Sequence, residues 1–197
     1  MDFHPDFHEA DEFQPSMLAL SHFIIQWNWA EHNFNVLLWA LSGDFMTGAQ
    51  YTTGLGNQSR ADLILATARR KEKDPEILGL IEFCVKAFGR IKDNRNALAH
   101  AHSIAQYGDE QKPRWLRASK NPRSLHVYCF ADMDDIVTNL DGSCQLAILL
   151  NQITCFYISS FEKKPRPSVG KFELPNPLIP IPVPLEAHED QPQPTQG

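Results

Sequence analysis

The sequence lacks an apolar run long enough to span a bilayer, and it lacks the basic start and apolar core of a secretory signal. Its richest apolar stretch, residues 23–41, is interrupted by six polar residues, and the chain starts with Met1-Asp2-Phe3-His4-Pro5-Asp6. We therefore expect a cytoplasmic protein without a membrane segment.

Several chemical signatures are missing as well. No G-x-S-x-G elbow occurs, and Gly54-Leu55-Gly56 lacks the spacing of a phosphate-binding loop. Cysteine is scarce, and no two of the four form a C-x-x-C pair: Cys84, Cys129, Cys144 and Cys155. We expect buried free thiols, no metal and no cofactor. The formal net charge of −6 argues mildly against a duplex-DNA binder, although it leaves room for a local basic groove.

Length and composition indicate one globular domain with flanking segments. The chain has 197 residues, 43% of them hydrophobic, which is enough for a substantial core. We divide it into a flexible acidic N-terminal segment (1–15), a mainly α-helical domain (16–163) and a proline-rich extended tail (164–197).

Apolar periodicity predicts the helices of that domain. Ser16 is a candidate N-cap for the first, in which Phe23, Trp27, Phe34, Leu38 and Leu41 share one face. Residues 43–57 are predicted to form a loop, and Asn57 or Ser59 to cap a second helix that ends in the charged run 69–74. The ordinary interpretation of that run is a solvated helix end, and the alternative is a nucleic-acid patch.

The third predicted helix starts at Asp74-Pro75, a capping residue followed by proline. Its buried stripe consists of Ile77, Ile81, Cys84, Phe88, Ile91 and Leu98, and Arg95 occupies the remaining position of the stripe. A guanidinium there needs a partner or a cavity, because an unpaired buried charge is costly. It either forms an ion pair with Glu31 of the first helix or lines a shared cleft.

A second face of the same helix carries Asp93, Asn96 and His100. Arg95 and His100 are five residues apart, roughly 140° around a helix. They do not form a same-face pair, which favours a pocket that two copies of the chain share across a two-fold axis.

The segment Arg95-Asn96-Ala97-Leu98-Ala99-His100 resembles the R-x-x-x-x-H motif of the HEPN superfamily, with a polar residue after the arginine. The resemblance covers about residues 17–160 and includes an acidic residue, Glu31, in a long first helix. It implies an antiparallel helical bundle that forms homodimers and cuts RNA without a metal. It further implies that His100 is the general acid or base, Arg95 holds the phosphate, Asn96 orients the histidine or the substrate, and Glu31 positions Arg95.

The chain departs from one toxin branch of that family, which has a tyrosine two residues after the histidine. His102 stands there, either as a further polar group of the cleft or as a histidine at the helix end. Residues 103–130 are predicted to form a β insertion of two or three strands. It interleaves basic and aromatic residues that suit single-stranded RNA: Arg114, Trp115, Arg117, Lys120 and Arg123. The alternative is a solvated hairpin anchored by Trp115.

A last helix is predicted over about 132–161, with a kink or break at Asp141-Gly142. In the tail, residues 174–185 combine prolines with aliphatic residues. Such a segment either lies extended against its own bundle or a dimer mate, or remains a flexible tail.

Two functions follow from these patterns. The first is a metal-independent HEPN-type endoribonuclease, a toxin or defence component controlled by an antitoxin or another regulatory protein. The second is a non-catalytic HEPN-like module that dimerises or binds a partner protein and uses Arg95 structurally.

Overall fold

The computed structural model describes residues 14–99, 102–104, 114–118, 126–131, 133–159, 164–178 and 181–182. The protein is mainly helical, as predicted. Its helices are α1 (Gln14–Ser42), α2 (Phe45–Thr52), α3 (Asn57–Lys71), α4 (Pro75–Ala99) and α5 (Met133–Ile158). In the described part of the chain, no helix is both long and apolar enough to cross a membrane.

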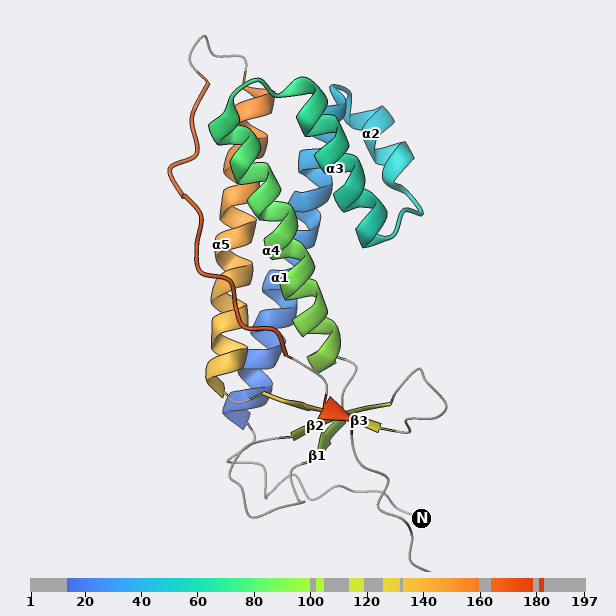
Figure 1. The fold of residues 1–197 in the computed structure, drawn as a ribbon, viewed down its shortest axis with the longest axis vertical. Coiled ribbons are helices and arrows are strands. Elements are labelled where there is room, and N and C mark those ends of the chain that lie inside the picture. The colour runs from blue at the N-terminus through green and yellow to red at the C-terminus, as the bar shows by residue number, and fades with distance from the viewer. Residues whose placement is uncertain are drawn as a thin grey trace, which may run out of the picture.

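Three long helices, α1, α4 and α5, lie side by side, and α2 and α3 pack at one end of them (Figure 1). The helix α4 runs antiparallel to its two neighbours, so α1 and α5 run in the same direction. The predicted stripes form the core between them: Trp27 and Phe34 of α1 both contact Phe88 of α4, with ring centroids 4.7 and 3.9 Å apart. Every apolar residue predicted for the two stripes is buried.

The prediction of a loop over 43–57 was wrong, because residues 45–52 form α2. Asp44 caps this helix by accepting hydrogen bonds from the backbone N–H groups of Met46 and Thr47. Hydrogen bonds from the Thr47 hydroxyl and these two amides lower the pKa of Asp44. Gly48 lies directly on Trp39 of α1, so the glycine that reads as a loop signal instead permits close helix packing.

Two finer expectations for the helices also need correction. The N-cap of α3 is Gly56, without a side-chain hydrogen bond, rather than Asn57 or Ser59. Residues 141–142 do not break α5, which is continuous from 133 to 158. A Cβ on Gly142 would lie 3.3 Å from Pro175 Cδ, so this glycine makes room for the tail. By contrast, Asp74 caps α4 as predicted, accepting from the Glu76 N–H at 2.9 Å.

Four short strands form an antiparallel sheet at the end of the bundle where α4 finishes (Figure 1). They are β1 (His102–Ile104), β2 (Arg114–Ala118), β3 (His126–Phe130) and β4 (Ile181–Pro182), in the order β1-β2-β3-β4. The last strand comes from the tail and pairs with β3 through Val127↔Pro182 and Tyr128↔Ile181. Proline is tolerated there because β4 is an edge strand.

Residues 164–178, which we call the strap, run extended along α4 and α5 of the same chain (Figure 1). At its start, Arg166 forms ion pairs with Asp74 and with Glu76, the latter at 2.7 Å. Farther along, the rings of Phe172 and Phe83 meet edge to face at 5.0 Å. For the described residues 174–178, the structure shows the docked alternative, against the chain's own bundle: Arg90 of α4 donates to the Pro175 backbone oxygen at 3.2 Å, and Leu178 is 9% exposed.

Candidate functional site

The predicted motif begins in the last turns of α4. Arg95 is half-buried, and its Nη1 donates a hydrogen bond to Asn96 Oδ1 at 3.0 Å. Its Nε is buried without a hydrogen-bond partner. Asn96 thus holds one arm of the guanidinium, and the inner nitrogen is covered by the protein without an acceptor.

The expected pairing of Glu31 with Arg95 is absent among the ion pairs of the described residues. Glu31 Oε1 lies 3.6 Å from Nη1 of Arg60, on α3. Because Phe34 stacks on Phe88 and the two helices are antiparallel, Arg95 is level with about residue 27 of α1, roughly 6 Å along the axis from Glu31. Glu31 therefore stabilises the contact between α1 and α3 rather than positioning Arg95.

Of the two predicted histidines, only His102 belongs to the described residues. His100 lies outside the described residues, just after the end of α4 at Ala99. Of the two alternatives for His102, the histidine at a helix end was wrong, because His102 opens β1 opposite Leu116 of β2. The chain leaves the helix before position 102 to pair with the next strand.

The structure describes three of the five RNA-binding candidates. Arg114, Trp115 and Arg117 belong to β2, where they pair with Phe130, Cys129 and Val127 of β3. Lys120 and Arg123 lie outside the described residues. The sheet that carries β2 lies at the end of the bundle where α4 finishes (Figure 1), and Arg95 is in the last turns of that helix.

Sequence reasoning missed Asn94, the residue before the motif. It is 1% exposed and donates to Asn139 Oδ1 at 2.9 Å and to the backbone oxygen of Asn176 at 2.7 Å. It also accepts from the Leu178 N–H at 2.9 Å. The position follows Ile91 by three residues and precedes Leu98 by four, so a polar residue on the buried stripe was the available signal. Asn94 fixes the strap one residue from Arg95.

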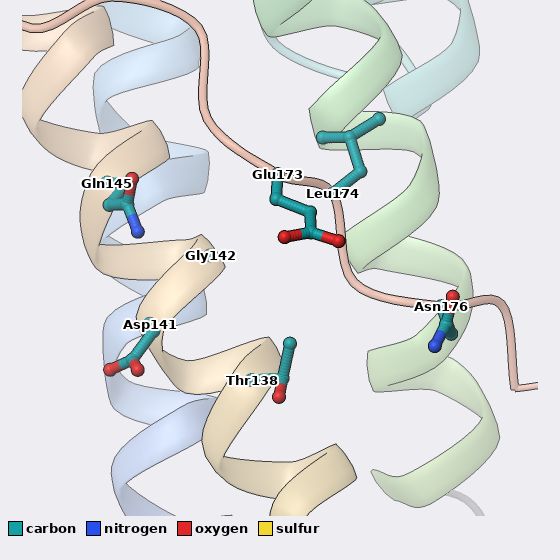
Figure 2. A pocket seen from close by; sticks show the side chains of 7 residues that line it. All are labelled: Thr138, Asp141, Gly142, Gln145, Glu173, Leu174 and Asn176. Atoms are coloured by element: carbon teal, nitrogen blue, oxygen red, sulfur yellow. The ribbon is translucent and has the colours of Figure 1, made fainter.

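A polar hollow of about 220 Å³ lies between the strap and α5, as Figure 2 shows. Its lining combines residues of both segments: Thr138, Asp141, Gly142, Gln145, Glu173, Leu174 and Asn176. The described residues contain no group of three His, Cys, Asp or Glu side chains placed to hold a metal ion. Burial, and then the charge of Asp141, raise the pKa of the nearby Cys144 thiol, which makes that thiol a poorer nucleophile.

Comparison with known proteins gave no match to a family model, a curated protein or a solved structure.

Proposed function

We propose that this protein is a metal-independent endoribonuclease of HEPN type, with a composite active site formed by two copies of the chain. The observation that carries the proposal is the environment of Arg95. A half-buried guanidinium has an inner nitrogen without a hydrogen-bond partner and makes no ion pair with another described residue. A phosphate oxygen of RNA would supply the opposite charge to the part of the guanidinium that is not buried.

The chemistry needs a base, an acid and stabilisation of charge at phosphorus. The 2′-hydroxyl oxygen attacks the adjacent phosphorus, and the bond to the 5′-oxygen breaks, which leaves a cyclic phosphate and a 5′-hydroxyl. His100 takes the proton from the 2′-hydroxyl or gives one to the leaving oxygen, since an imidazole has a pKa near ~6.5. Arg95 binds the phosphate oxygens as charge develops, and Asn96 keeps its guanidinium oriented. The basic residues of β2 extend the RNA-binding surface.

The test uses purified full chain with single-stranded RNA in EDTA, and the products are analysed for cyclic phosphate and 5′-hydroxyl ends. His22, which is exposed on α1, provides a matched control. We expect cleavage by the wild type and by His22→Ala, and a loss of about 100-fold or more in His100→Ala and Arg95→Ala. Full activity in His100→Ala would refute the assigned chemistry.

A second candidate function, a non-catalytic dimerisation module, is favoured by the exposed side of α1. Leu18, Ile25 and Trp29 are 59%, 60% and 47% exposed and share one face. Glu31 is the only residue with a formal charge in the 29 residues of α1, and depletion of charge is typical of an interface core. Ile25 is about 200° around the helix from Trp27, which packs on α4.

A two-fold contact through this face would therefore leave the two Arg95 residues on opposite sides of the interface. This candidate predicts a dimer that Ile25→Glu converts to a monomer in light-scattering measurements, together with no RNA cleavage by either protein. A wild-type monomer would eliminate it.

A further inference from the structure

The end of the bundle remote from Arg95 contains a cavity of about 510 Å³ between α1, α2 and α3. Its apolar wall is formed by Leu38, Leu55 and Leu63, one from α1, one from the α2–α3 connection and one from α3. Threonines of α2 and α3 also line the cavity, and the exposed Arg70 and Lys71 lie at its rim. Sites for small organic ligands commonly have this size and this mixture of apolar wall and few polar groups.

The wall is held in place by contacts that do not depend on a ligand. Gly48 lets α2 approach so closely that a Cβ there would be 2.8 Å from Trp39 Cα. The indole Nε1 of Trp39 donates to Thr52 Oγ1 at 2.9 Å, which joins α1 to the end of α2. The cavity is therefore built into the packing of the helices.

The three basic residues that end α3 have different roles. Arg69 pairs with Glu82 of α4 at 2.9 Å. Lys71 Nζ donates to the backbone oxygens of Leu41 and Ser42, at 2.6 and 3.4 Å, and so compensates the C-terminal end of α1. Arg70 has no hydrogen bond or ion pair with another residue in the described ranges, and it lines the cavity. The described lining contains no carboxylate to neutralise these cations.

We propose that this cavity binds an amphipathic organic monocarboxylate, whose alkyl body contacts the leucine wall and whose carboxylate pairs with Arg70 at the rim. The basic residues at the rim favour a ligand with an anionic group at one end. The leucine wall favours an apolar body at the other end of the same ligand. The site does not depend on the proposed RNA chemistry, because it lies at the opposite end of the helices.

The test is isothermal titration of the full chain with decanoate, kept below the concentration at which it forms micelles. Decanol is the uncharged comparison ligand. Arg70→Gln removes the proposed anchor, and Arg69→Gln is the matched control because Arg69 pairs with Glu82 and does not line the cavity. Leu63→Gln tests the apolar wall, and Leu63 is 37% exposed, so the change does not disturb the buried core.

We expect saturable binding of decanoate to the wild type and to Arg69→Gln, with an affinity about tenfold lower in Arg70→Gln and in Leu63→Gln. Decanol should bind at least tenfold more weakly than decanoate. No saturable binding, equal affinity for decanol, or equal affinity in Arg69→Gln and Arg70→Gln would each overturn the proposal.

Discussion

The same substitution, glycine to alanine, should change stability in opposite directions at two helical positions. Alanine is favoured over glycine inside a helix by about 0.8–1 kcal/mol. At Gly89, in α4, a new Cβ meets no atom within 4 Å, so only this gain applies. At Gly48, in α2, the Cβ would lie 2.8 Å from Trp39 Cα, a backbone atom that cannot swing away.

Overpacking of this kind costs about 1–3 kcal/mol. Over most of that range, the cost is larger than the gain in helix propensity. Gly89→Ala should therefore raise the free energy of unfolding by about 0.8 kcal/mol, and Gly48→Ala, where the two effects oppose each other, should lower it by up to about 2 kcal/mol. For a domain of this size the melting temperature should rise by about 2–3 °C in the first variant and fall by up to about 8 °C in the second.

Urea denaturation followed by circular dichroism, with calorimetry for the melting temperatures, gives both numbers. The two variants are controls for each other, because the chemical change is identical. If Gly48→Ala were as stable as Gly89→Ala, the close approach of α2 to α1 would not exist, and the rigid wall of the cavity would lose its basis.

Three further outcomes are expected. Asn94→Ala removes three hydrogen bonds and should destabilise the protein by about 2–4 kcal/mol in urea denaturation, whereas the exposed Asn28→Ala should cost under about 0.5 kcal/mol. Arg166→Ala breaks only exposed ion pairs, so it should cost no more than about 1 kcal/mol, and a larger loss would contradict the exposure seen here. Because burial raises the pKa of the Cys84 thiol, iodoacetamide should label Cys155 in the native protein and Cys84 only after unfolding, as read by mass spectrometry of peptides.

The long helices were predictable because a stripe that recurs at helical spacing reports directly which face is buried. The start of α4 was equally clear, since Asp74 and Pro75 act locally and need no tertiary information. The helix α2 was not, because it depends on Gly48 lying against Trp39, nine residues away in the sequence and in another element. Gly142 misled for the same reason, as its role is set by Pro175.

In the candidate site, too, the roles that depend on tertiary contacts could not be predicted from the sequence. Arg95 was placed on the buried apolar stripe, but Asn94 occupies that position, 1% exposed, and Arg95 beside it is only half-buried. Of the two alternatives for its partner, the ion pair with Glu31 does not form, because Glu31 pairs with Arg60 of α3, a contact that depends on how the helices pack. Asn94 escaped notice because the strap that it binds lies more than eighty residues later in the chain.

The parallel arrangement of α1 and α5 has a consequence for how the chain reaches its native state. These two helices pack against each other, although roughly 90 residues separate the end of one from the start of the other. In an up-and-down bundle each helix finds its neighbour across a short turn, but here the principal helix pair forms only after a long segment has been closed. The entropy of that closure opposes early formation of the pair, so folding should be slower than in a simple bundle of equal length.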